Sequence, residues 1–144
     1  HMPDHVLGLL QDGFKEASKK IQDSQILVLG ISYKPDVKDI QITPAEPLIK
    51  KLKQLNAKVK IYDPYFKFTE IFGIKTENNM VDALDNTDAV LLITAHKEFH
   101  DLEPTFLASK LKTPIVVDSR GIIDNHAAKK AGLIFRGLGR GKIE

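Results

Sequence analysis

The stretch that decides the fold is Gln25-Ile26-Leu27-Val28-Leu29-Gly30, a run of branched apolar residues closed by a glycine. An apolar run without alternating polar positions is typical of a strand that is buried on both faces of a parallel sheet. Two runs of the same kind follow at residues 88–94 and 114–118, and shorter ones lie at 59–63 and 133–136. We therefore expect a mostly parallel sheet built from these strands.

Helical segments separate the strands. We expect helices over residues 44–55, 79–84 and 104–111, and one that begins after Asp124 and ends at Gly132. The alternation of strands and helices predicts a doubly wound, Rossmann-like α/β domain with helices on both faces of the sheet. Residues 65–75 fit neither pattern.

Local signals predict where these helices begin. Thr43 is expected to be an N-cap, with Pro44 at the first helical position. Asn79 and Asp124 are expected to cap the helices that follow them. Pro47 lies in the first turns of its helix and is expected to cost a backbone hydrogen bond there.

An amphipathic helix is expected before the first strand, over residues 3–22. Its apolar stripe comprises Val6, Leu10, Phe14, Ala17 and Ile21. Gly8 and Gly13 each weaken a helix by about 1 kcal/mol relative to alanine, so this helix needs a packing partner. We expect it to pack on the α/β body or on a second copy of the chain. Residues 1–2, His1-Met2, are expected to be an expression-tag remnant.

The composition excludes several classes of protein. The chain has 144 residues, of which 42% are hydrophobic and 28% charged, and this suits one globular domain. No apolar run reaches the ~18–20 residues of a membrane span. A net charge of +2 is too small to indicate a nucleic-acid partner. The chain has no cysteine, and therefore no disulfide, cysteine-bound metal or thiolate nucleophile. We expect a cytoplasmic protein that binds neither membranes nor nucleic acids.

Polar residues that could bind a ligand follow three of the expected strands. Ligands of open parallel sheets bind outside the carboxyl ends of the strands, and here these ends carry Lys34, Asp63 and Arg120. Lys34 could reach a phosphate or a sugar hydroxyl, or lie solvated at the surface. The planar guanidinium of Arg120 suits a diphosphate or a carboxylate, or an ion pair with a nearby aspartate. Asp63 could hold a ribose, or cap the turn before Pro64.

Two other patterns do not meet the requirements of the sites that they suggest. The dinucleotide fingerprint G-x-G-x-x-G needs three glycines, and Gly30 stands alone. His96 and His100 have the spacing of two zinc ligands on one helix face. The segment His96-Lys97-Glu98-Phe99-His100, however, lacks the glutamate that directly follows the first histidine in metalloproteases. We expect no metal site in this chain.

A series of motifs runs in order along nearly the whole chain. They are the segment 26–39 with its Tyr33-Lys34-Pro35-Asp36-Val37 core, Thr43-Pro44-Ala45, the segment 59–65, Thr87-Asp88-Ala89-Val90, the segment 96–99, and Val116-Val117-Asp118-Ser119-Arg120. Together they resemble the C-terminal domain of the UDP-glucose/GDP-mannose dehydrogenase family. The Lys-Pro-Asp-Val form is most similar to the members that oxidise UDP-N-acetyl-hexosamines such as UDP-N-acetylmannosamine.

The resemblance implies a two-step, NAD-dependent oxidation of the C6 alcohol of a UDP-sugar to a carboxylate. It implies that NAD is bound mainly by an N-terminal Rossmann domain of the same polypeptide, and that the catalytic cysteine also lies outside this chain. Residues 3–23 would then be the end of the linker or dimerisation helix, and residues 24–144 the C-terminal UDP-sugar-binding domain. The full-length enzyme is expected to be a homodimer, and this chain alone is expected to be inactive.

The resemblance also implies roles for individual residues. Tyr33 and Lys34 match the pair that lines the nucleotide-sugar site, and Arg120 matches the arginine that reaches the substrate across the cleft. Many members carry an arginine seven residues after that lysine, where it contacts NAD. Gln41 stands at this position, and a neutral amide lacks the charge-assisted contact to a phosphate.

The alternative to a domain of such an enzyme is a stand-alone Rossmann-like nucleotide-binding or interaction module without a catalytic partner domain.

Overall fold

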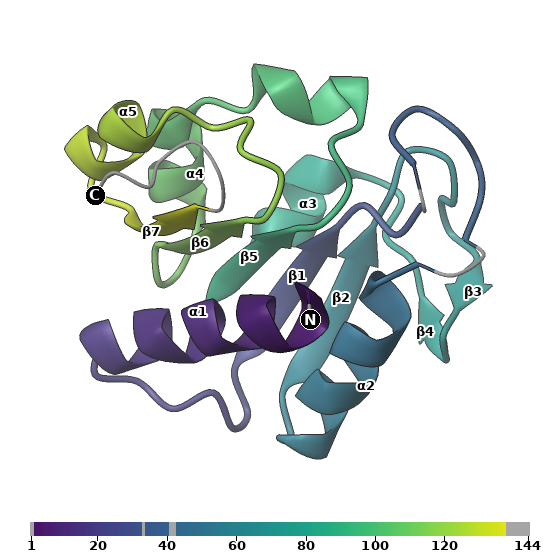
Figure 1. Ribbon diagram of the computed structural model, residues 1–144, viewed down its shortest axis with the longest axis horizontal. Coiled ribbons are helices and arrows are strands. Elements are labelled where there is room, and N and C mark those ends of the chain that lie inside the picture. Colours follow the sequence, from purple (N-terminus) through teal and green to yellow (C-terminus); the bar gives the residue numbers. More distant parts are fainter. Residues whose placement is uncertain (1, 33, 41–42, 138–144) are drawn as a thin grey trace.

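A five-stranded parallel sheet lies at the centre of the computed structural model, which describes residues 2–32, 34–40 and 43–137 (Figure 1). Its strands are β1 (Gln25–Leu29), β2 (Lys58–Tyr62), β5 (Ala89–Leu92), β6 (Ile115–Asp118) and β7 (Ile134–Gly137), in the order β2-β1-β5-β6-β7. Every neighbouring pair is parallel. The predicted doubly wound α/β fold is therefore confirmed.

Helices cover both faces of this sheet. They are α1 (Met2–Glu16), α2 (Ala45–Gln54), α3 (Met80–Leu84), α4 (Pro104–Lys110) and α5 (Asn125–Lys130), and a 3₁₀ helix spans Lys97–Asp101. α1 and α2 lie on one face, and α3, α4 and α5 lie on the other (Figure 1). Among the residues that the structure describes, no helix is long and apolar enough to cross a membrane.

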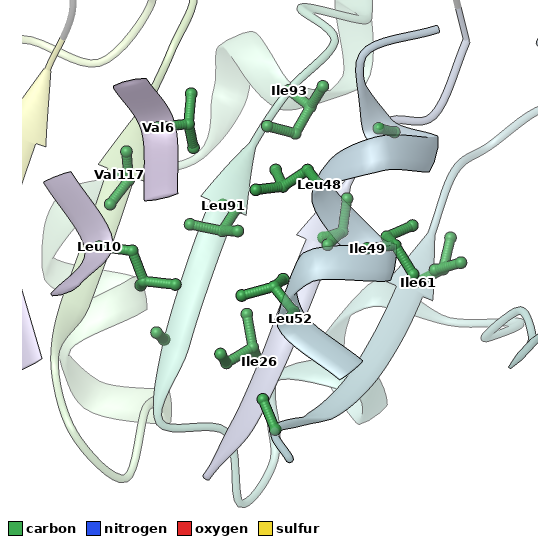
Figure 2. Packing of buried hydrophobic residues seen from close by; sticks show 14 of the residues in the cluster. Val6, Leu10, Ile26, Leu48, Ile49, Leu52, Ile61, Leu91, Ile93 and Val117 are labelled. Atoms are coloured by element: carbon green, nitrogen blue, oxygen red, sulfur yellow. The ribbon is translucent and has the colours of Figure 1, made fainter. Parts of the chain in front are cut away.

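The apolar strands are buried because each face of the sheet has its own core. Ile26 and Val28 of β1 pack under α1 and α2, whereas Leu27 and Leu29 pack on the opposite side. Figure 2 shows the first core, in which side chains from the two helices meet those of the strands. This two-sided burial explains why β1 has no alternating polar positions.

The N-terminal helix α1 packs on the α/β body through the predicted stripe. Val6, Leu10 and Phe14 are buried, and α1 lies against β6, β7 and α2. The glycine at residue 13 lets α1 lie close to the sheet, because a Cβ atom there would lie 3.0 Å from a methyl carbon of Ile115. The helix is further tied to β7 by Arg136, which donates hydrogen bonds to Asp12 and Glu16.

The prediction that this helix continues to residue 22 is wrong, because α1 ends at Glu16. Ser18 adopts a left-handed conformation with φ 58°. The N–H of Ser18 donates to the carbonyl of Lys15, and the N–H of Lys19 donates to that of Phe14. This pair of bonds is a Schellman motif, which terminates a helix.

The start of α2 differs by one residue from the prediction. The helix begins at Ala45 rather than Pro44, and the Thr43 hydroxyl accepts the N–H of Ala45 at 3.2 Å. Pro47 is then the third helical residue. The expected loss of a hydrogen bond at Pro47 is wrong, because the N–H groups of a first turn have no acceptor within the helix.

The other capping predictions are confirmed. The side chain of Asn79 accepts the N–H of Asp82, and that of Asp124 accepts the N–H of Ala127. Part of the segment 65–75, which had no recognisable pattern, forms a short hairpin of β3 (Glu70–Ile71) and β4 (Ile74–Lys75). Strands of two residues are too short to produce a periodic pattern in the sequence.

We predict that Leu10→Ala lowers the free energy of unfolding by about 2–5 kcal/mol, because it removes a fully buried side chain between α1 and the sheet. Chemical denaturation of the chain measures this loss. Gln11→Ala is the matched control on the exposed side of the same helix and should change stability by less than about 0.5 kcal/mol. Equal stability of the two variants would show that α1 does not pack on the body in solution.

Candidate functional site

The order of the strands places a topological switch point between β1 and β5. The chain runs from β1 outward to β2, and later returns to the other side of β1 to form β5. In open α/β sheets, ligands bind outside the carboxyl ends of the strands at such a switch point. The loops that follow β1, β2, β5 and β6 all leave from this edge, since the strands are parallel.

Gly30 allows two of these loops to approach each other closely. It has a φ of +89°, and a Cβ atom there would lie 2.6 Å from the Cβ of Thr94. The Thr94 hydroxyl also donates to the carbonyl of Ser32 at 2.8 Å. Gly30 therefore allows the loops after β1 and β5 to pack against each other, and no dinucleotide fingerprint surrounds it.

The carboxylate of Asp63, directly after β2, is fully buried at this edge. Its Oδ2 accepts hydrogen bonds from the N–H of Ile31 at 2.7 Å and from the Ser32 hydroxyl at 3.2 Å. Its Oδ1 accepts the N–H of Tyr65 at 2.9 Å, so Asp63 does cap the turn that begins at Pro64. Since these oxygens are occupied by groups of the protein, the interpretation of Asp63 as a turn cap is favoured over that of a ribose ligand.

The pKa of Asp63 lies below its ordinary value. Burial raises the pKa, but the hydrogen bonds from His96, Ile31 and Tyr65 outweigh burial and favour the charged form. Asp63 is therefore a buried carboxylate that is held ionised by the donors around it.

His96, in the loop after β5, is the fourth donor to Asp63. Its imidazole is fully buried, and its Nε2 lies 2.9 Å from Oδ2 of Asp63. The rings of Tyr65 and Phe99 contact the imidazole, with centroid distances of 5.0 and 5.7 Å. His100 is exposed, so the two histidines do not share a surface. Within the described residues, no group of three or more metal-binding side chains occurs.

The loop after β6 is organised by Asp118. Its Oδ1 accepts the backbone N–H groups of Arg120 and Gly121, each at 2.9 Å, and its Oδ2 accepts that of Ile123 at 2.7 Å. Asp118 thus binds the backbone of Arg120 rather than its guanidinium. The side chain of Arg120 is exposed, and it forms no ion pair with any residue that the structure describes.

Lys34 and Arg120 lie in loops at the same edge of the sheet. Their loops follow β1 and β6, which are separated only by β5. Two strand spacings amount to about 10 Å. Both side chains are exposed. The other two candidate residues, Tyr33 and Gln41, lie outside the described residues.

Three depressions on the surface lie elsewhere. One lies between α2 and the β3–β4 hairpin, one between α4 and α5, and one around residues 75–79. Neither Lys34 nor Arg120 lines any of these three.

The comparison with known proteins agrees with this geometry. The sequence profile described as "UDP-glucose/GDP-mannose dehydrogenase family, UDP binding domain" matches residues 27–125. This chain belongs to that family. The matched range begins in β1 and includes the loops after β1, β2, β5 and β6.

Individual relatives within the family are much longer than this chain. UDP-N-acetyl-D-mannosamine dehydrogenase of Methanococcus aeolicus is 33% identical over 144 residues, which are 98% of this chain and 32% of that protein. UDP-glucose 6-dehydrogenase TuaD of Bacillus subtilis is 32% identical over 124 residues, which are 83% of this chain and 27% of that protein. A solved structure of UDP-D-ManNAc dehydrogenase from Pyrococcus horikoshii matches with a TM-score of 0.85 at 28% identity, over 98% of this chain and 31% of that one. The chain spans about a third of the length of these relatives.

The sequence did not reveal the buried Asp63–His96 pair of this family member. The two residues are 33 positions apart, and their contact depends on the order of the strands. The spacing between His96 and His100 suggested a comparison with metal ligands instead. A usable signal was the position of both residues in loops that follow parallel strands, because the ends of such strands meet at one edge.

We predict that Asp63→Asn lowers the free energy of unfolding at neutral pH by about 1–3 kcal/mol, because an amide nitrogen would face donors that now bind a carboxylate. The folded pKa of Asp63 lies below the unfolded value, ~3.9, so its stabilisation is present above that pH and is lost as the pH falls through the folded pKa. The variant should lack this part of the acid dependence.

Denaturation curves recorded from neutral to acid pH measure both effects. Asp101→Asn is the control, because Asp101 is exposed. If Asp63→Asn unfolded with the same stability and the same acid dependence as the wild type, Asp63 would not be held ionised by its donors.

Proposed function

We propose that this chain is the UDP-sugar-binding domain of a larger, NAD-dependent nucleotide-sugar 6-dehydrogenase. The enzyme would oxidise the C6 alcohol of UDP-N-acetylmannosamine to a carboxylate in two steps. The observation that carries the proposal is the match of residues 27–125 to the UDP binding domain of the family. The Lys-Pro-Asp-Val sequence at residues 34–37 and the similarity to UDP-N-acetyl-D-mannosamine dehydrogenases support this choice of sugar.

In this proposal, Lys34 and Arg120 bind and orient the nucleotide-sugar. A UDP-sugar carries a negatively charged diphosphate, and both side chains are cations at the same edge of the sheet. A guanidinium can donate two parallel hydrogen bonds to a phosphate, and an ammonium offers a compact charge. Tyr33 would line the site next to Lys34. None of these residues would perform the chemical step.

The remaining parts of the enzyme would come from outside residues 24–144. NAD would be bound mainly by an N-terminal Rossmann domain of the same polypeptide, and Gln41 would contribute no charged contact to it. Residues 3–23 would be the end of a helix that links the domains of a cytoplasmic homodimer, and residues 1–2 a tag remnant. The packing of α1 on β6 and β7 supports a firm attachment of this helix to the domain.

We predict that the 144-residue chain, mixed with NAD and a UDP-sugar, forms no NADH. The chain has no cysteine that could act as the nucleophile and no dinucleotide fingerprint. NADH absorbance over time measures this. Turnover above a protein-free blank would overturn the assignment as a binding domain.

We predict that Arg120→Ala in the full-length enzyme raises the KM for the UDP-sugar by about tenfold or more. A charge-assisted hydrogen bond contributes roughly 1.5–3 kcal/mol, and ~1.4 kcal/mol corresponds to a factor of ten. Steady-state kinetics with varied UDP-sugar measures the change.

The matched control is Lys112→Ala. Lys112 is also an exposed cation, but it lies in the turn between α4 and β6, before the amino end of β6 and so at the opposite edge of the sheet. The KM of the Lys112→Ala enzyme for the UDP-sugar should stay at the wild-type value. Equal KM values for both variants would exclude Arg120 from the site. A full-length protein that oxidises no UDP-sugar would favour a binding or interaction module instead.

A further inference from the structure

Both ring nitrogens of His96 are engaged in hydrogen bonds within the protein. The Nδ1 atom accepts the backbone N–H of Asp36 at 2.8 Å, and the Nε2 atom lies 2.9 Å from Oδ2 of Asp63. A nitrogen that faces an N–H group must be unprotonated, so the ring hydrogen lies on Nε2 and is donated to Asp63. Asp63 thereby fixes the tautomer that allows His96 to hold Asp36.

A second hydrogen bond joins the same two loops, with the donor now in the loop after β5. Oδ1 of Asp36 accepts the backbone N–H of Lys97 at 2.7 Å. Asp36 also adopts a left-handed conformation with φ 61°, which is unfavourable for a residue with a side chain. The two bonds to residues 96 and 97 stabilise Asp36 in this conformation, although its side chain is at the surface.

This connection acts two residues away from Lys34. The loop that begins after β1 crosses to the loop after β5 at Asp36, and Lys34 lies just before that crossing. A lysine side chain has several rotatable bonds, so the backbone position decides which volume its ammonium group can sample. Holding Asp36 therefore keeps the backbone of Lys34 at the edge where Arg120 also lies.

We propose that His96 is a positioning residue for Lys34, and that it acts by holding Asp36 from within the core. This inference rests on the proposed function, because it assigns His96 a role in binding the UDP-sugar. His96 itself is fully buried and does not contact the ligand.

Two substitutions separate the hydrogen bonds of the ring. Asparagine can place its Oδ1 where Nδ1 of His96 lies, so His96→Asn keeps an acceptor for Asp36 and loses the donor to Asp63. Glutamine can place its Nε2 where that of the histidine lies, so His96→Gln keeps the donor to Asp63 and loses the acceptor. Both variants alter the core, but only His96→Gln releases Asp36.

The first measurement is amide hydrogen exchange of Asp36 in the 144-residue chain, which has its own core and needs no ligand for this test. His96→Gln should accelerate exchange of the Asp36 amide by about tenfold or more, since ~1.4 kcal/mol is a factor of ten. His96→Asn should leave it within about twofold to threefold of the wild-type rate, because the acceptor is kept. Wild-type protection in His96→Gln would overturn the inference, whether or not the chain binds UDP.

The second measurement is the KM for the UDP-sugar in the full-length enzyme. His96→Gln should raise the KM by about fivefold while kcat stays within about twofold, as expected when only binding is lost. In a Lys34→Ala background, His96→Gln should raise the KM no further, because its effect acts through Lys34. Additive effects in the double variant would reduce His96 to a general structural role and overturn the inference.

Nitrogen NMR of the His96 ring in the unsubstituted chain keeps the test decisive if His96→Gln fails to fold. The ring hydrogen should lie on Nε2, which leaves Nδ1 able to accept the N–H of Asp36. A ring hydrogen on Nδ1 would overturn the inference. If the full-length protein without substitutions oxidised no UDP-sugar, the proposed function would be overturned instead.

Discussion

A buried carboxylate must collect hydrogen-bond donors, and Asp63 collects them from three separate loops. The donors come from residues 31 and 32 after β1, from Tyr65 after β2 and from His96 after β5. An unpaired charge at this depth would cost far more than the fold can supply. The three loops at the switch point are therefore held together by one ionised group, and the geometry of the ligand edge depends on it.

The two cations of the proposed site have a common arrangement. Each is an exposed side chain on a backbone that a buried aspartate holds. Asp118 accepts the N–H of Arg120 directly, whereas Asp63 acts on the loop of Lys34 through residues 31 and 32 and through His96. Such preorganisation lowers the entropic cost of ordering a loop when a ligand binds. Both cationic side chains are exposed, whereas Asp63, His96 and Asp118 are buried.

The sequence was informative where burial alone decides the structure. The runs in β1, β5 and β6 are apolar because both faces are covered, and such runs can be recognised without knowing the neighbours. The end of α1 was missed because Ser18 adopts a left-handed conformation, which a serine in the sequence does not predict. The Asp63–His96 contact was missed because it joins loops whose proximity follows from the strand order. Lys34 and Arg120 could be placed at one edge, since that required only parallel strands.

The packing of α1 has a consequence for the order of folding. This helix precedes every strand of the domain, yet the strands that it contacts most are β6 and β7, the last two. Arg136 reaches back to Asp12 across 124 positions. Contacts between distant segments form slowly, because a long loop must close before they contribute. During synthesis the apolar stripe of α1 has no β6 or β7 to cover it until nearly the whole domain has left the ribosome. The nascent domain therefore exposes the apolar stripe of α1 until its last strands emerge, and final closure of the core waits for those strands.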